Sequence, residues 1–250
     1  MSPRAPHRFH HPGPIGPRAP GERLLLPVSE SHHLIDVLRL REGTPIDLFD
    51  AAGATYRARF VGRRDGRAEI ELLAPLDSAS PAGPVVKLAV AMLKRRAMDL
   101  LIEKLSELGV DTLQPLHTRR SVIPPRAEDE PGVPERWSRL AIAAAKQCGR
   151  PRPLSLPPPM AVEHWLQADR PPADGLVAAF GGNPRPLGEW LRQRPALDRP
   201  IWIAIGPEGG WTPAEQAAFE SAGYVPVGLG PLTLRAETAA IAAAAACRLM

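Results

Sequence analysis

The chain is poor in cysteine and in aromatic residues, and it has no long apolar run. Only two of its 250 residues are cysteines, Cys148 and Cys247, and 5% are aromatic. Two cysteines outside a C-x-x-C spacing cannot form a disulfide framework, which favours a reducing compartment. No stretch approaches the roughly 18 apolar residues that a membrane-spanning helix needs, and the Pro-rich start has no apolar core typical of a secretion signal. We therefore expect a cytoplasmic protein with no membrane segment.

Motifs for common nucleotide and metal sites are also missing. The sequence contains no G-x-x-x-x-G-K-[ST] and no G-x-G-x-x-G that opens a helix after a strand, which argues against a classical dinucleotide enzyme. The pairs His10–His11 and His32–His33 have no cysteine or carboxylate at ligand spacing, and adjacent residues on a helix point to different faces. We therefore expect no metal site.

Positive charge is concentrated in one segment. The net charge is +4, and residues 84–126 alone carry eight basic and four acidic residues. Such a segment is typical of a surface that binds a polyanion such as RNA, although an ordinary solvated face has the same composition. If that polyanion is RNA, the residues predicted to hold its phosphates are Lys94, Arg95, Arg96, Arg119 and Arg120 in this segment, together with Arg63, Arg64 and Arg67 before it.

The pattern of apolar residues divides the chain into two regions. Residues 21–76 alternate apolar and polar residues between turn signals, which predicts a small β barrel interrupted by one helix at residues 29–40. In that helix Leu34, Val37 and Leu38 are expected on one face. A segment rich in Pro, Ser, Ala and Gly follows at residues 76–84, and we place the domain boundary there, dividing the chain into residues 1–80 and 81–250.

The second region alternates short apolar strands with amphipathic helices. Its first helix is predicted to end near Gly109, and apolar strands are expected at residues 175–180, 201–205 and 225–229. This alternation predicts an α/β domain with a mostly parallel sheet covered by helices.

Two glycine-containing loops follow strands of that sheet. In the first, residues 201–215 (IWIAIGPEGGWTPAE), an apolar strand is followed by a loop of small residues and then by the start of a helix. Thr212 and Glu215 are spaced as a capping box, and Pro213 suits the first helical position. Glycines without Cβ atoms let a ligand approach the main chain, although a tight turn also uses glycine. LGPLTLRAETAA, residues 229–240, repeats the arrangement. Strands of a parallel sheet deliver such loops to one edge, so we expect them to form a pocket.

Together these motifs resemble the bacterial 16S ribosomal RNA uridine N3-methyltransferases of the SPOUT superfamily. The resemblance rests on residues 97–122, 136–150, 205–215 and 229–240, with a further match at residues 31–50. It implies a PUA-like RNA-binding barrel followed by an α/β domain with a trefoil knot, S-adenosylmethionine as cofactor, a homodimer, and 16S ribosomal RNA or the small ribosomal subunit as partner. The implied reaction is methylation of N3 of uridine 1498. The chain departs from the family pattern at Ala97, Arg119, Lys146 and Leu232.

The chemistry of that reaction suggests roles for individual residues. Our hypothesis is that Arg235 stabilises negative charge on the uracil oxygens, and that Glu237 or Glu208 orients Arg235 or accepts the N3 proton. A structural ion pair or helix cap is the competing interpretation of Glu237. The expected cofactor-binding residues are Phe180, Gly181, Ile205, Gly206, Pro207, Glu208, Gly209, Gly210, Leu229, Gly230, Leu234, Thr238 and Ala239.

Three other functions remain open from the sequence. An enzyme of the same superfamily could methylate a ribose 2′-OH or another base. A non-catalytic RNA-binding assembly factor would share the fold, and a small-molecule α/β enzyme would bind no RNA.

Overall fold

The computed structural model describes residues 6–77, 83–121, 132–168, 174–179, 184–194 and 199–249. The chain forms two compact units. The first comprises Met1–Pro81 and Ala145–Pro153, and the second comprises Ala82–Ala144 and Leu154–Met250. The boundary predicted after residue 80 lies beside the first of these divisions. No pattern in the sequence predicts that Ala145–Pro153 packs with the first unit.

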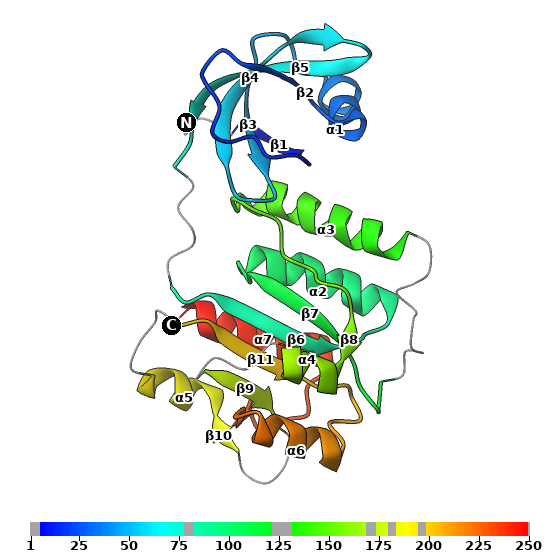
Figure 1. Ribbon diagram of the computed structural model, residues 1–250, viewed down its shortest axis with the longest axis vertical. Coiled ribbons are helices and arrows are strands. Elements are labelled where there is room, and N and C mark those ends of the chain that lie inside the picture. Colours follow the sequence, from blue (N-terminus) through cyan, green and yellow to red (C-terminus); the bar gives the residue numbers. More distant parts are fainter. Residues whose placement is uncertain are drawn as a thin grey trace. The chain divides into compact units, whose positions relative to one another are not determined.

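The first unit is built on a five-stranded sheet with the order β1-β3-β4-β5-β2 (Figure 1). Its strands are β1 (His7–His11), β2 (Arg23–Leu25), β3 (Pro45–Asp50), β4 (Thr55–Arg64) and β5 (Arg67–Pro75). Only the β1–β3 pair is parallel. Alternate residues of β4 and β5 are buried, as the period of a strand with one core face requires. Strand β1 lies in the Pro-rich start, where the sequence predicts no strand.

A short helical segment completes the first unit. Helix α1 (Val28–His32) continues into a π-helical turn, η1 (His33–Val37). Leu34 is fully buried, whereas Val37 is 57% exposed. The prediction that Val37 shares the buried face of Leu34 is therefore wrong. The reason is the wider π turn, whose i→i+5 hydrogen bonds shift the residues that follow away from the positions that α-helical spacing gives them.

The second unit is built on a seven-stranded sheet with the order β10-β12-β9-β11-β6-β7-β8. Every pairing in it is parallel. The strands are β6 (Val86–Ala91), β7 (Thr112–His117), β8 (Met160–Ala161), β9 (Gly175–Ala178), β10 (Arg185–Pro186), β11 (Ile201–Ile205) and β12 (Val225–Gly228). The central strand β11 is buried along its whole length, which explains its uninterrupted apolar sequence. The predicted parallel α/β sheet is confirmed.

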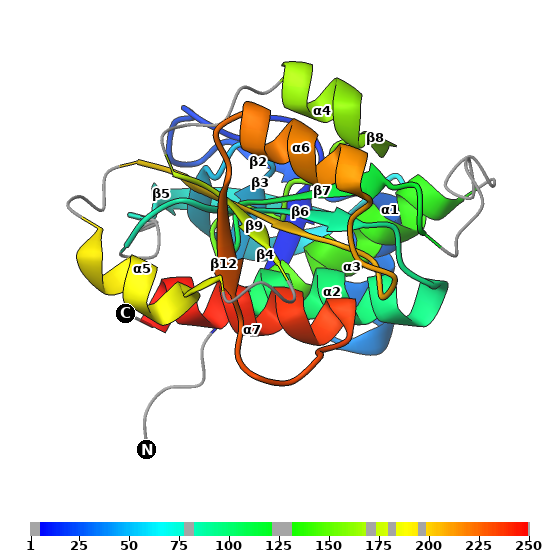
Figure 2. The same cartoon turned by 90° about the horizontal axis from the view of Figure 1, so that it is seen from below.

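Helices cover both faces of this sheet (Figure 2). They are α2 (Arg95–Glu107), α4 (Val162–Ala168), α5 (Leu187–Gln193), α6 (Pro213–Ser221) and α7 (Ala236–Leu249). A further helix, α3 (Val133–Cys148), begins in the second unit and ends in the first. Helices α2 and α7 lie on one face and share a core with the strands, whereas α4 and α6 lie on the other. On that second face Trp165, Phe219 and Tyr224 pack with tilted or edge-on rings, the arrangement that aromatic quadrupoles favour.

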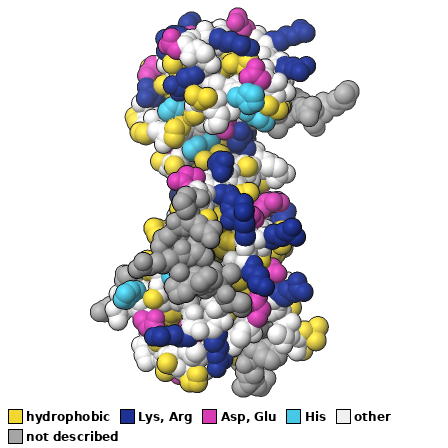
Figure 3. Space-filling model, turned by 90° about the vertical axis from the view of Figure 1, so that its right-hand side faces the viewer, with side chains coloured by type: hydrophobic (Ala, Val, Ile, Leu, Met, Phe, Trp, Pro, Cys, Tyr) yellow, Lys and Arg dark blue, Asp and Glu magenta, His cyan; other side chains and the backbone are white. Residues whose placement is uncertain are grey.

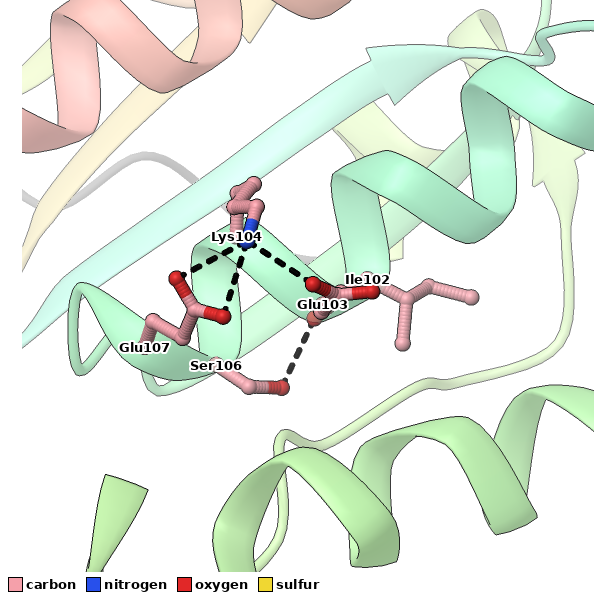
Figure 4. A network of polar contacts seen from close by, with 5 residues as sticks. All are labelled: Ile102, Glu103, Lys104, Ser106 and Glu107. Atoms are coloured by element: carbon pink, nitrogen blue, oxygen red, sulfur yellow. Dashed lines mark hydrogen bonds and ion pairs between the residues drawn. The ribbon is translucent and has the colours of Figure 1, made fainter. Parts of the chain in front are cut away.

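Helix α2 confirms the periodicity seen in the sequence. Met98, Leu101, Ile102 and Leu105 are all buried, and the left-handed φ of +72° at Gly109 terminates the helix. On its exposed side the ammonium of Lys104 contacts the carboxylates of Glu103 and Glu107 at 2.8 and 2.9 Å (Figure 4). These hydrogen bonds raise the pKa of Lys104. Part of the basic charge in this segment is therefore compensated locally.

Candidate functional site

The loop after β11 needs glycine for two physical reasons. A Cβ on Gly206 would lie 3.0 Å from the ring of Trp211, and one on Gly209 would lie 3.2 Å from Cβ of Arg120. Gly210 has a φ of +67°, and its N–H donates to the Pro207 carbonyl at 2.8 Å to close the turn. The loop therefore passes close to its neighbours in a backbone conformation that side chains disfavour.

A buried carboxylate anchors this loop. Thr212 and Glu215 form the predicted capping box at the start of α6. One oxygen of Glu215 accepts from the Thr212 N–H at 2.8 Å, and the other accepts from the Arg119 N–H at 2.9 Å. Glu215 is only 2% exposed, so the carboxylate makes these charge-assisted bonds out of water. It thus joins the segment after β7 to the segment after β11.

The neighbouring Arg120 adds a second connection between the same segments. Its guanidinium donates to the carbonyls of Gly209 at 2.8 Å and Trp211 at 3.3 Å. The indole N–H of Trp211 in turn donates to the carbonyl of Ala178, at the end of β9, at 3.2 Å. Three strand ends are therefore held together at one edge of the sheet.

The loop between β12 and α7 reaches the same edge. Gly230 has a φ of +127°, and a Cβ on Gly228 would lie 3.3 Å from the carbonyl oxygen of Pro184. Helix α7 begins after Arg235, whose carbonyl accepts from the Ala239 N–H at 2.8 Å. Small alanine side chains follow at the start of the helix and leave space beside the loop.

Both loops line one cavity of about 300 Å³. This volume is at the lower end of the range of small-molecule sites. The glycines place no Cβ between a ligand and the main chain, the alanines add apolar surface, and Glu208 supplies an exposed carboxylate. The lining residues are Arg120, Ala178, Ala179, Ile205, Gly206, Pro207, Glu208, Gly209, Gly210, Trp211, Gln216, Leu229, Gly230, Leu232, Thr233, Leu234, Ala236 and Ala239.

Most of the residues predicted to bind a cofactor line this cavity. Those that do are Ile205, Gly206, Pro207, Glu208, Gly209, Gly210, Leu229, Gly230, Leu234 and Ala239. Thr238 is exposed and is not part of the lining, and Phe180 and Gly181 lie outside the described residues. Sequence reasoning missed Trp211 and assigned Arg120 to RNA instead of to this cavity. It did point to the end of β9, because Phe180 and Gly181 directly follow Ala178 and Ala179, which line the cavity.

The two residues predicted to be catalytic do not line the cavity. Arg235 is exposed and Glu237 is half-buried, both at the start of α7. Glu208 is the predicted acid that does reach the cavity wall. Within the described ranges no three or more His, Cys, Asp or Glu side chains are grouped as a metal site would require. Among the helices described, none combines the length and apolar character needed to cross a bilayer.

Comparison with known proteins identifies the family. Residues 81–248 match the model of the RNA methyltransferase domain, and residues 26–73 match that of the RNA methyltransferase PUA domain. The chain belongs to the RNA methyltransferase family. A relative from Synechocystis sp., named ribosomal RNA small subunit methyltransferase E, is 32% identical over 86% of this chain and 69% of its own length. A Mycobacterium tuberculosis protein of the same name is 31% identical over 86% of this chain and 81% of its own.

Solved structures of similar proteins agree with this assignment. Ribosomal RNA small subunit methyltransferase E from Neisseria gonorrhoeae, solved with bound S-adenosylmethionine, has a TM-score of 0.83 at 30% identity and covers 97% of this chain and 96% of its own. A Legionella pneumophila protein, also solved with the bound cofactor, has a TM-score of 0.86 at 26% identity and covers 98% of both chains. The RNA methyltransferase thus has the PUA domain and parallel α/β domain that its sequence predicts.

The predicted RNA contacts of this RNA methyltransferase fall into distinct environments. Lys94, Arg95 and Arg96, at the start of α2, are exposed, and their side chains make no hydrogen bond or ion pair with a described residue. The side chain of Arg119 is exposed and lies 3.8 Å from Glu163. The guanidinium of Arg120 instead donates hydrogen bonds to main-chain carbonyls in the cavity wall. Figure 3 shows cationic side chains on the surface of each unit, interspersed with acidic ones.

The three predicted contacts in the first unit also differ. Arg67 donates to the Leu26 and Leu25 carbonyls at 2.6 and 3.1 Å, and Arg64 pairs with Glu69 at 3.0 Å. Arg63 is exposed and lines a separate hollow. Their roles in binding RNA remain predictions.

Proposed function

We propose that the chain transfers a methyl group from S-adenosylmethionine to N3 of a uridine in 16S ribosomal RNA. Membership in the RNA methyltransferase family supports the reaction class. The names of the relatives support small-subunit ribosomal RNA as the substrate, and the resemblance of the motifs supports N3 of uridine 1498. By the same resemblance we expect a knotted, homodimeric enzyme that acts in the cytoplasm.

The cavity between the two glycine-containing loops is the observation that carries this proposal. Main-chain groups of its glycines that make no bond within the protein can pair with the polar edges of an adenosine, and its alanine and leucine side chains can cover the apolar faces. The carboxylate of Glu208 offers a counter-charge to a cationic ligand. The residues present therefore fit the cofactor, which when bound supplies an electrophilic methyl group on a positively charged sulfur.

The residues of the chain would bring the uracil and the methyl group into line. The bound cofactor would supply the methyl group and leave as the neutral thioether, and N3 must lose its proton to accept that methyl group. We propose that Glu208 or Glu237 accepts this proton and that Arg235 donates to a uracil oxygen, which carries the negative charge. Arg235 is free to meet a substrate because its side chain is exposed. The position of Glu208 on the cavity wall favours it over Glu237 as the base.

The base must also leave any duplex, because N3 lies on its Watson–Crick edge. Exposed cations at the start of α2 would hold the phosphates that flank it, which makes binding sensitive to salt.

Nucleoside analysis of ribosomal RNA tests this function directly. RNA from a strain lacking the protein should contain no N3-methyluridine at the target, and the purified protein with S-adenosylmethionine should restore it. A missing 2′-O-methyl group, or another missing methylated base, would contradict the proposed reaction. An unchanged nucleoside pattern would contradict the enzyme activity on this RNA.

A further inference from the structure

The first unit contains a second hollow, separate in its residues from the cofactor cavity. Its volume is about 510 Å³. The walls combine apolar side chains with two guanidinium groups and one carboxylate. We call it the Arg39–Arg63 pocket, and its lining residues are Ile35, Arg39, Leu40, Glu42, Phe60 and Arg63.

The charged groups of this pocket are available to a ligand. Arg39, Glu42 and Arg63 are all exposed, and none of their side chains makes a hydrogen bond or ion pair with another residue in the part of the chain that the structure describes. A guanidinium group presents its donors in a planar fork that matches the oxygens of a phosphate. Two arginines and one glutamate leave a net positive charge in the pocket, which suits an anion.

The backbone at Arg39 adopts a conformation that its side chain disfavours. The φ of Arg39 is +51°, a region that non-glycine residues seldom occupy. It follows the π-helical turn η1, where Leu40 N–H donates back to the Leu34 carbonyl at 3.1 Å. Helices commonly end with glycine in this left-handed position. Non-glycine residues in sparsely populated conformations cluster at functional sites, so the conformation of Arg39 supports a binding role without establishing one, and Asp65 has a similar φ of +52° in a turn.

A β-bulge lies between Phe60 and Arg63, the two residues of β4 that line the pocket. The register of β4 against β5 shifts between Phe60 and Gly62. Gly62 has a φ of +150°, and a Cβ there would lie 3.3 Å from Oε1 of Glu42. Bulges occur often beside binding sites, where they redirect a strand. The bulge and the left-handed arginine thus border the same pocket.

We propose that the Arg39–Arg63 pocket binds one unstacked nucleotide of single-stranded RNA. The two guanidinium groups hold its phosphate, and its base rests on the apolar wall formed by the half-buried side chains of Ile35 and Leu40. The carboxylate of Glu42 can only accept hydrogen bonds when ionised, so it selects a base with adjacent N–H donors, as on the Watson–Crick edge of guanine. This inference rests on the proposed function and adds a second RNA-binding position to it.

A double variant tests the phosphate interaction. Arg39→Asn keeps a residue that tolerates the left-handed conformation, and Arg63→Gln keeps a similar length. Fluorescence anisotropy of the full chain with a labelled, unstructured, guanine-containing RNA would be measured at several salt concentrations. We expect about tenfold weaker binding and a salt slope that is smaller by about 0.7 for each phosphate that the variant no longer neutralises. An unchanged unfolding temperature would show that the variant is folded.

The matched control removes the same charge elsewhere in the first unit. Arg18→Ala with Arg23→Ala deletes two arginines that pair with Glu22 and Glu69. We expect RNA affinity within about twofold of the unchanged chain, because distant exposed charges are screened. If the two double variants bound the RNA with equal affinity, the proposal would be overturned, whether that affinity was reduced in both variants or unchanged in both.

Glu42→Gln tests the base interaction separately. It should reduce the preference for guanine over uracil in the RNA while leaving the salt slope unchanged, and an unaltered preference would overturn the role of Glu42. Calorimetry with S-adenosylmethionine and a methyl-transfer assay on the unchanged chain separate the two proposals. If methyl transfer is absent but the pocket variants still weaken RNA binding, the proposed function fails and the pocket stands.

Discussion

Glu215→Ala should destabilise the second unit because it removes an acceptor shared by two segments. The variant leaves the partly buried N–H groups of Arg119 and Thr212 without their carboxylate and breaks the capping box of α6. A donor left without a partner away from water costs about 1 to 3 kcal/mol, so we expect a loss of about 3 kcal/mol in the free energy of unfolding. Urea unfolding followed by tryptophan fluorescence would measure it, since Trp211 lies in the anchored loop.

The control is Glu220→Ala, an exposed glutamate on the same helix. Surface substitutions of this kind change stability by about 0.5 kcal/mol or less. Glu215→Gln should fall between the two variants, because an amide keeps one acceptor oxygen but replaces the other with a donor. The loosened loop should also weaken S-adenosylmethionine binding in Glu215→Ala. If Glu215→Ala matched Glu220→Ala in stability and in cofactor affinity, the anchoring role of this carboxylate would be refuted.

Three further predictions concern other parts of the second unit and the two thiols. Gly109→Ala should destabilise by more than about 1 kcal/mol in urea unfolding, because φ is +72° and the new Cβ would lie 2.9 Å from Nη2 of Arg248; a neutral effect would contradict this. Arg235→Ala should keep S-adenosylmethionine binding in calorimetry but lose methyl transfer, and normal methylation would reject its catalytic role. Burial raises the pKa of Cys247 to about 12, from an ordinary value of 9.0. The stability that comes from keeping the Cys247 thiol protonated should be complete below pH 9.0 and should disappear as the pH rises toward 12. At neutral pH a thiol reagent should modify exposed Cys148 well before buried Cys247. Equal reaction rates of the two thiols would contradict the burial of Cys247.

The sequence predicts the second unit well because its physical signals are local. The apolar spacing of Met98, Leu101 and Ile102 and the box from Thr212 to Glu215 each lie within a few residues, and the structure confirms both. Parallel strands then carry both glycine-containing loops to one edge, as the rule for such sheets predicts.

Features that depend on interactions between distant parts of the sequence could not be predicted in this way. Strand β1 is stabilised by pairing with β3, although its own segment is rich in proline. Arg120 lies in the basic segment that the sequence predicts to bind RNA. In the structure its guanidinium instead donates a hydrogen bond to the carbonyl of Gly209, which is far away in sequence, and it forms part of the cavity wall. The π turn that exposes Val37 has no periodic signal of its own.

A crystal structure of the protein grown with S-adenosylmethionine tests the central claim most directly. We predict electron density for the cofactor in the cavity between residues 206–210 and 229–234, against main-chain groups of both loops. Cofactor density elsewhere on the molecule, with this cavity filled only by water, would contradict the account.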